Sequence, residues 1–143
     1  MTVLIDADGC PVVDITVRTA AEAGADCIII CDTAHVFEKP GAKTVIVSQG
    51  SDSVDFTIVN MVKKGDVVVT QDYGLAAMCL ARGAVPVSQN GMIYSDRNID
   101  GLLHQRYESK KLRMAGGRMK GPPKRTADQD AAFERLLRGL LEL

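Results

Sequence analysis

The stretch LIDADGCPVVD, residues 4–14, places two carboxylates and a turn directly after an apolar run. The run predicts a buried strand over residues 2–6, and the Gly-Cys-Pro step predicts a sharp turn into a helix from Pro11 to about Gly24. A strand that enters a protein core should end in carboxylates only where something there stabilises negative charge. Asp6 and Asp8, two residues apart and so able to face one site, are the first candidates for such a site.

Short β-branched runs alternate with longer helical stretches along the rest of the chain. Runs this apolar, separated by helices, predict a mostly parallel five-stranded sheet covered on both faces, which is a three-layer α/β fold with C-terminal helices. The further strands are expected at 26–31, 43–48, 66–70 and 84–88, followed by a hairpin-like piece at 90–95. The further helices are expected at about 53–64, 73–83 and 98–114, with a last helix after Thr126.

The composition fits one compact domain over residues 1–143, with 46% hydrophobic and 24% charged residues. No stretch approaches the roughly 18 apolar residues that a membrane span needs, and no basic leader precedes the first strand. We therefore expect a cytoplasmic protein without a membrane partner. The four cysteines form no CxxC pair, which argues against a zinc site or a disulfide framework.

Charge is unevenly distributed along the chain. Residues 1–96 form an acidic α/β body of net charge −6, residues 97–125 a basic helix and loop of net charge +7, and residues 126–143 a last helix of net charge −2. A basic segment beside an acidic body is typical of a protein that binds a polyanion. A solvent-exposed helix and loop with a chance excess of positive charge would give the same pattern. The candidates for nucleic-acid contact are Arg106, Lys110, Lys111, Arg113, Arg118, Lys120, Lys124 and Arg125.

Acidic residues also follow the third and fourth strands. Asp52 and Asp55 come after the third strand, and Asp72 comes after the fourth. Ligand sites of parallel sheets form at the carboxyl ends of the strands, so these acids are expected at one site with Asp6 and Asp8. Clustered carboxylates repel one another unless a cation lies among them, and Mg²⁺ or Mn²⁺ suits such oxygen ligands. Each acid also has a local explanation, since Asp52 and Asp72 could cap helices.

Six segments carry a resemblance to a known family. They are DADGCP, GSDSVD, GDVVVTQDYGLA, NIDGLLHQR, GGRMKGPP and DQDAAF, which occur in this order along nearly the whole chain. Together they resemble the YaiI/YqxD family of small bacterial proteins, which is grouped with the PIN-like domains. Many PIN-like domains are metal-dependent ribonucleases.

The resemblance implies a PIN-like fold and an Mg²⁺- or Mn²⁺-dependent endoribonuclease. By position, Asp6, Asp55 and Asp72 would be the catalytic metal ligands, with Asp8 and Asp52 as further ligands nearby. The pattern departs from PIN nucleases in one place. Those enzymes usually carry a further acid after the fifth strand, where this chain reads SQNG, with Gln89 and Asn90.

Other interpretations of the same residues stay open. The substrate could be DNA instead of RNA, or the chain could be a non-catalytic nucleic-acid-binding or regulatory module. The DADGC motif also resembles the Asp-x-Asp-Gly-Thr motif of haloacid-dehalogenase-like phosphatases, but Cys10 stands in place of the Thr and no later Asp-Asp pair occurs. The apolar stripe of the last helix must pack on the body or on a second copy of the chain, so a homodimer is an alternative to a monomer.

Overall fold

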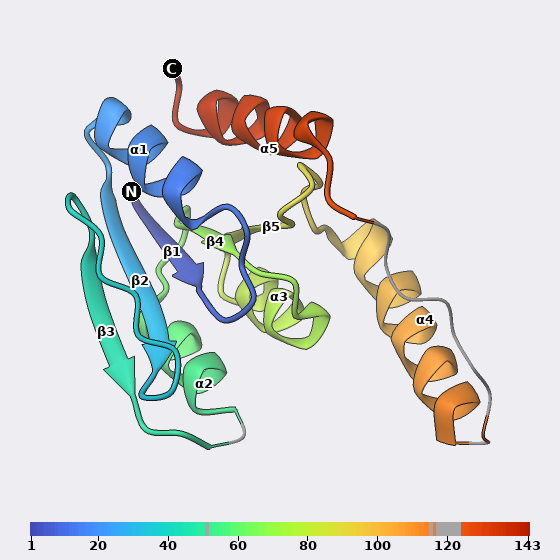
Figure 1. Ribbon diagram of the computed structural model, residues 1–143. Helices are drawn as coiled ribbons and strands as arrows, with labels where there is room; N and C mark the ends of the chain where they lie inside the picture. The colour runs from blue at the N-terminus through green and yellow to red at the C-terminus, as the bar shows by residue number, and fades with distance from the viewer. Residues whose placement is uncertain (51, 115, 117–123) are drawn as a thin grey trace.

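The computed structural model describes residues 1–50, 52–114, 116 and 124–143, and these form an α/β fold of five strands and five helices (Figure 1). The strands are β1 (Thr2–Asp6), β2 (Asp26–Asp32), β3 (Lys43–Val47), β4 (Val67–Val69) and β5 (Val85–Val87). The helices are α1 (Val13–Ala23), α2 (Ser53–Met61), α3 (Tyr73–Ala81), α4 (Asp96–Met114) and α5 (Ala127–Leu140). None of the helices in the described part of the chain combines the length and apolarity required to cross a bilayer.

The sheet has the strand order β3-β2-β1-β4-β5, with β1 at its centre. All pairings among the described strands are parallel, so the expected α/β sheet is confirmed and is parallel throughout rather than mostly so. The chain runs outward from β1 to β3 and then returns to β4 on the other side. Strand order therefore reverses beside β1, and the carboxyl ends of β1 and β4 flank the crevice in which such sheets bind ligands.

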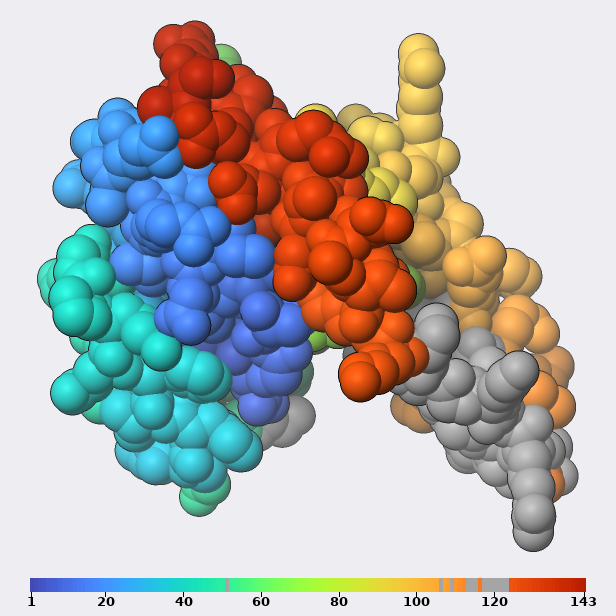
Figure 2. Space-filling view, turned by 45° about the horizontal axis from the view of Figure 1, so that its top comes forward, coloured from blue at the N-terminus to red at the C-terminus, as the bar shows by residue number. Residues whose placement is uncertain are grey.

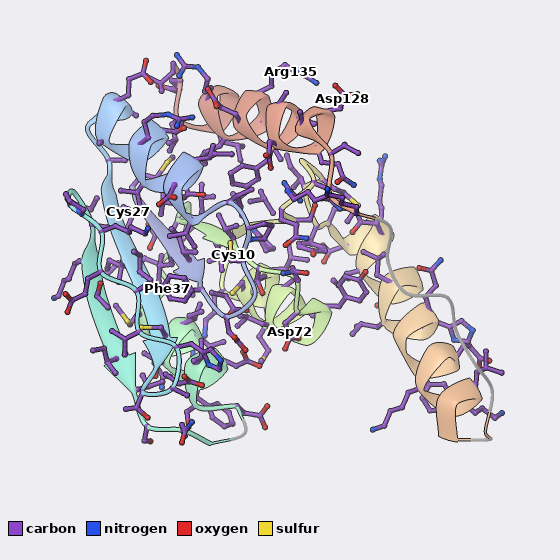
Figure 3. All side chains as sticks on the ribbon, in the orientation of Figure 1. Cys10, Cys27, Phe37, Asp72, Asp128 and Arg135 are labelled. Carbon is purple, nitrogen blue, oxygen red and sulfur yellow. The ribbon has the colours of Figure 1, made fainter. Side chains whose placement is uncertain are left out.

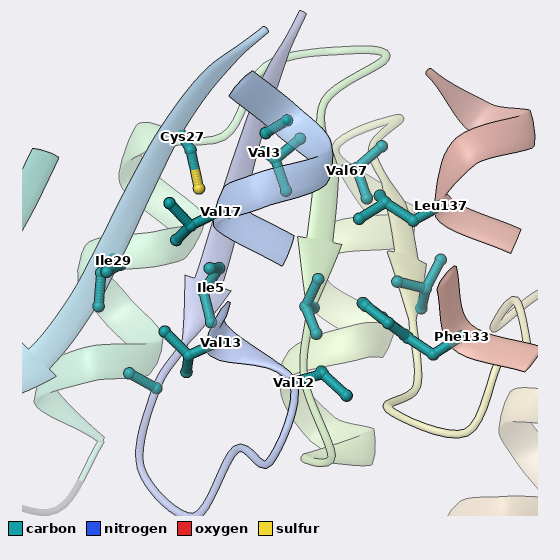
Figure 4. Packing of buried hydrophobic residues seen from close by; sticks show 14 of the residues in the cluster. Val3, Ile5, Val12, Val13, Val17, Cys27, Ile29, Val67, Phe133 and Leu137 are labelled. Carbon is teal, nitrogen blue, oxygen red and sulfur yellow. The ribbon is translucent and has the colours of Figure 1, made fainter. Parts of the chain in front are cut away.

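Two apolar clusters fill the layers on either side of the sheet. On one face, Val3 and Ile5 of β1 pack with α1 and with Phe133 and Leu137 of α5 (Figure 4). On the other face, Leu4 packs with α2 and α3. Consecutive strand residues point to opposite faces, and every residue in the middle of β1 is apolar because both faces are covered. The last helix thus packs on the body, as one of the two sequence interpretations expected.

Two local details differ from the sequence prediction. The first helix begins at Val13 rather than at Pro11, because the Cys10 N–H donates to the Ala7 carbonyl and closes a tight turn before the helix. Gly9 supplies the positive φ of 67° that this turn requires. The hairpin-like piece contributes only an isolated antiparallel bridge between Val87 and Ile93.

The helix α4 extends away from the body, as Figures 1 and 2 both show. Its first half packs on α3 through Ile99, Leu102 and Leu103. The helix α5 lies across the surface beside α1 (Figure 2), where Arg138 forms an ion pair with Glu22 at 2.8 Å.

Candidate functional site

An open cavity of about 630 Å³ lies at the carboxyl edge of the sheet. All five predicted acids line it, although they come from three separate segments of the chain. A sixth acid, Asp32 at the end of β2, also lines it and was not predicted. The complete lining is Asp6, Asp8, Asp32, Gly50, Asp52, Val54, Asp55, Gln71, Asp72 and Tyr73.

Thr70 links two of these acids. Its hydroxyl donates to Asp6 Oδ2 at 2.7 Å and accepts from the Asp72 backbone N–H at 3.0 Å. Its carbonyl accepts from the Tyr94 hydroxyl at 3.1 Å, and Thr70 itself is buried. The end of β1 and the start of α3 are therefore held in one arrangement by a single side chain.

Helix starts place the next two acids. Asp72 caps α3 by accepting from the Leu75 N–H at 3.1 Å, which confirms the predicted cap, and Figure 3 shows it beside α3. Asp55 lies in the first turn of α2 and lines the same cavity as Asp72. Asp52 precedes α2 but caps nothing with its side chain, because it has a left-handed backbone with φ of 69°. The predicted cap at Asp52 is wrong, so its carboxylate is not used by the helix.

The carboxylates raise one another's pKa values. The pKa of Asp55 is raised to about 6, first by burial and then by the negative charges of Asp72, Asp6 and Asp52, with the hydrogen bond to Asp72 adding to the shift. Burial also raises the pKa of Asp6; the Thr70 hydrogen bond opposes this shift, and the charges of Asp72 and Asp8 add to it. Raised pKa values of this kind mark a place where negative charge is poorly compensated.

The donor chemistry fits a hard divalent cation, because the polar lining consists mainly of carboxylates. As the side chains lie, no three acid, imidazole or thiol groups of the described residues gather closely enough to hold one ion. Mg²⁺ needs fewer direct ligands, since it usually keeps several waters and binds through one or two carboxylates. Asp55 and Asp72, which already contact each other, are the pair that meets this requirement.

The sixth acid is held by its own loop. Asp32 Oδ1 accepts from the backbone N–H groups of Ala34 and His35, both at 2.9 Å, and lies 3.3 Å from His35 Nδ1. The same imidazole nitrogen lies 3.8 Å from Asp8 Oδ1. Strand-end position could have identified Asp32 from the sequence, but the predicted strand stopped at Cys31, one residue short.

Cys10 follows Asp6 and Asp8 in the turn after β1. Burial is the largest influence on its thiol and raises the pKa of Cys10 to about 11, so the thiol stays protonated at neutral pH. Cys10 is half-buried and packs against the core on the α1 side of the sheet (Figure 3).

The basic residues fall into three groups. Lys110, Lys111 and Lys124 are exposed. Arg118 and Lys120 lie outside the described residues, as do the side chains of Arg106 and Arg113. Arg125 is engaged within the molecule: its Nε contacts Asp130 Oδ1 at 2.7 Å, and its two terminal nitrogens donate to Asn90 Oδ1 and to the Gln89 carbonyl. Its predicted contact with a phosphate would compete with these three partners.

Comparison with known proteins decides the family. The sequence profile described as "Uncharacterized BCR, YaiI/YqxD family" matches residues 4–143. The chain belongs to the YaiI/YqxD family. A UPF0178 protein of Exiguobacterium sibiricum is 52% identical over 141 residues, covering 99% of this chain and 96% of that protein. A UPF0178 protein of Ruminiclostridium cellulolyticum is 48% identical, over 96% of this YaiI/YqxD chain and 90% of that protein. A UPF0178 protein of Clostridium acetobutylicum is 44% identical, over 99% of this chain and 97% of that protein.

One solved structure is similar over the same length. The crystal structure of a mutant of Rae1 (YacP) from Bacillus subtilis aligns with 99% of this YaiI/YqxD chain and 97% of its own, with a TM-score of 0.45 and 14% sequence identity.

Proposed function

We propose that this YaiI/YqxD protein is a divalent-metal-dependent nuclease that cleaves RNA phosphodiester bonds in the acidic cavity. The observation that carries the proposal is that Asp55 and Asp72 line one cavity with further acids, beside the point where strand order reverses, and that these negative charges add to the raised pKa of Asp55. Asp72 also accepts from the Leu75 N–H, whereas the charges that surround Asp55 are those of other acids. A cation that replaces the proton of this pair relieves the repulsion.

Each acid has a distinct task in this proposal. Asp55 and Asp72 would hold the ion, whereas Asp6, fixed by Thr70, would orient a water beside it. Asp8 and Asp52 are exposed at the rim of the cavity and contribute negative charge. A bound Mg²⁺ or Mn²⁺ supplies the chemistry, because it activates water for in-line attack on a phosphate and stabilises the leaving oxygen.

The exposed lysines provide the contact with the substrate backbone. The basic segment 97–125 contains three exposed lysines, which are Lys110, Lys111 and Lys124. They lie outside the acidic segment 1–96 that supplies the carboxylates. Lysine binds phosphate as a point charge without reading base edges, so these contacts give affinity with little sequence preference. Binding should therefore weaken as salt rises.

The substitution Asp72→Asn tests the proposal. Asn caps a helix about as well as Asp, so α3 should stay folded with nearly the wild-type melting temperature. The charge needed to hold the ion is lost, so Mg²⁺- or Mn²⁺-dependent cleavage of a single-stranded RNA should fall by more than the roughly 10- to 100-fold that loss of an outer-shell partner costs. Cleavage and melting are measured on the same sample.

Asp26→Asn is the matched control, because Asp26 is an exposed acid at the opposite edge of the sheet. Its cleavage rate should equal that of the wild type. Cleavage by Asp72→Asn at the wild-type rate would reduce Asp72 to a helix cap and refute the proposed metal site.

The second candidate is a non-catalytic RNA-binding module. The amides Gln89 and Asn90 favour it, because they stand where PIN nucleases usually carry a further acid. A wild-type protein that binds RNA but cleaves no RNA or DNA with either metal would establish this module. Hydrolysis of an aryl phosphate that is lost in Asp6→Asn would instead establish the phosphatase.

A further inference from the structure

A second cavity of about 230 Å³ lies next to the acidic one. Gln71 and Tyr73 line both cavities, so the two share a wall. The second cavity is formed where β5 ends and the chain turns back to make its bridge to Val87. Its complete lining is Gln71, Tyr73, Ser88, Gln89, Asn90, Met92 and Tyr94.

One side of this cavity is aromatic and firmly held. The rings of Tyr73 and Tyr94 meet edge to face, with centroids 5.9 Å apart and an interplanar angle of 63°. Tyr94 is 2% exposed and its hydroxyl donates to the Thr70 carbonyl, so its polar atom is already used. Tyr73 is half-buried against it and offers a flat surface at the border of the two cavities.

The other side of the cavity is polar and incompletely paired. Gln89 Oε1 is buried and has no hydrogen-bond partner among the described residues. Asn90 turns its Oδ1 to Arg125, which leaves its amide N–H groups as donors. Ser88 Oγ accepts from the N–H groups of Asn90 and Met92, which leaves its proton to donate. A buried acceptor without a partner costs stability, and a ligand donor would remove that cost once Gln89 turns its amide oxygen into the cavity.

We infer that this cavity binds one unstacked, amino-bearing nucleobase of single-stranded RNA, against Tyr73 and with its amino group donating to Gln89, while the neighbouring phosphate lies over the carboxylates. The position of the phosphate rests on the proposed function, whereas the base site does not. The volume is below the roughly 300 Å³ at which drug-sized pockets begin, which suits a single ring system. Single strands present such bases, because their edges and faces are free for hydrogen bonding and stacking.

The loop that carries the polar side is held from α5. Arg125 donates to Asn90 Oδ1 at 2.7 Å and to the Gln89 carbonyl at 2.6 Å, and its Nε is paired with Asp130 at the start of α5. Gly91, with φ of 86°, lies so close to α5 that an added Cβ would stand 2.8 Å from the Ala132 backbone. Arg125 is thus a positioning residue for the base site.

Three small probes separate base recognition from phosphate binding. Cytidine 5′-monophosphate and uridine 5′-monophosphate are alike in size but only the first has an exocyclic amino group, and ribose 5-phosphate has no base. Titration of the full chain with each probe in Mg²⁺ should give the tightest binding for the cytidine nucleotide, by about fivefold over the uridine nucleotide, as expected for one hydrogen bond. Ribose 5-phosphate should bind most weakly.

Two variants assign the preference to residues. Gln89→Ala should abolish the difference between the cytidine and uridine nucleotides while leaving ribose 5-phosphate unchanged. Tyr73→Leu should weaken both nucleotides roughly tenfold relative to ribose 5-phosphate, because stacking is lost. Asn60→Ala, which removes an exposed amide near the far end of α2, is the matched control and should keep the wild-type order.

Equal binding of the three probes, or binding of none, would overturn the base site. So would a cytidine preference that survives in Gln89→Ala. An RNA cleavage assay on the same wild-type sample separates this failure from that of the nuclease. Cleavage with equal probe binding leaves the nuclease standing without the base site, whereas a cytidine preference without cleavage leaves the base site standing without the nuclease.

Discussion

Carboxylates at the two edges of the sheet have opposite kinds of neighbours, which are backbone N–H donors at one edge and other acids at the other. At the amino edge, Asp66 is 6% exposed and each of its oxygens accepts a backbone N–H, from Thr2 at 3.0 Å and from Lys63 at 2.9 Å. At the carboxyl edge, Asp55 meets another acid, Asp72, and further negative charges surround it. The first acid joins the start of β1 to the turn before β4. The second belongs to a cluster whose charges oppose one another.

This contrast separates acids that stabilise the fold from acids that are available for binding. Burial alone does not make the distinction, because Asp66 is more buried than any acid of the cavity. The two kinds of acid differ in their partners. A carboxylate that accepts two N–H groups has its hydrogen bonds satisfied, whereas a carboxylate that faces other carboxylates does not. The same Asp-to-Asn substitution should therefore have opposite effects at the two edges.

The largest expected effect concerns metal and Asp55. If the cavity holds Mg²⁺ or Mn²⁺, the wild type should gain about 2.7 kcal/mol of unfolding free energy at a metal concentration one hundred times Kd. Asp55→Asn should lose this gain while its metal-free form is at least as stable as the wild type at pH 7, because repulsion is relieved. Thermal melts across a metal titration measure both quantities. A full metal response in Asp55→Asn would mean that the acidic edge binds its ion without this residue.

The next largest effect should be a loss of stability from Asp66→Asn at the amino edge of the sheet. In Asp66→Asn an amide NH₂ group replaces one of the two carboxylate oxygens, each of which accepts a backbone N–H in the wild type. One backbone N–H therefore loses its hydrogen-bond acceptor. The free energy of unfolding should fall by about 2 kcal/mol, with the metal response unchanged. Urea denaturation with and without Mg²⁺ checks this result. A variant as stable as the wild type would remove the distinction between the two edges.

The smallest effect is a pH dependence of the metal-free protein. The pKa of Asp55 is raised from 3.8 to about 6, so the folded state binds more protons than the unfolded state between these pH values. Its contribution to stability therefore falls as pH rises through this window. Asp6 shifts in the same direction. Melts in a chelating buffer from pH 4 to pH 7 should show this decline in the wild type and a smaller one in Asp55→Asn. An equal decline in both proteins would assign it to other groups.

Much of the acidic cavity was predictable because its acids follow strands. Apolar runs identify parallel strands, and the residues after them meet at one edge whatever their separation in sequence. This rule found all five predicted acids, which are Asp6, Asp8, Asp52, Asp55 and Asp72. It also explains why Asp32 was missed, since an error of one residue at a strand end removed it from consideration.

The second cavity could not be predicted in the same way. It depends on the bridge between Val87 and Ile93 and on the contact of Gly91 with α5, which are long-range contacts without a periodic pattern. Arg125 shows the same limit. Its place in a run of basic residues suggested a phosphate contact, but its partners Asp130 and Asn90 are brought together only by the fold.

The helix α4 contacts the body only through its first half, among the side chains that the structure describes. Its apolar contacts with the body come from Ile99, Leu102 and Leu103, whereas Tyr107 and Leu112 farther along are 62% and 48% exposed. Nineteen helical residues span about 28 Å. A rotation of about 10° at the base of such a helix would displace its far end by about 5 Å, so a small change in packing on α3 would shift Lys110 and Lys111 by a similar distance. The carboxylates of the cavity lie elsewhere, at the carboxyl edge of the sheet.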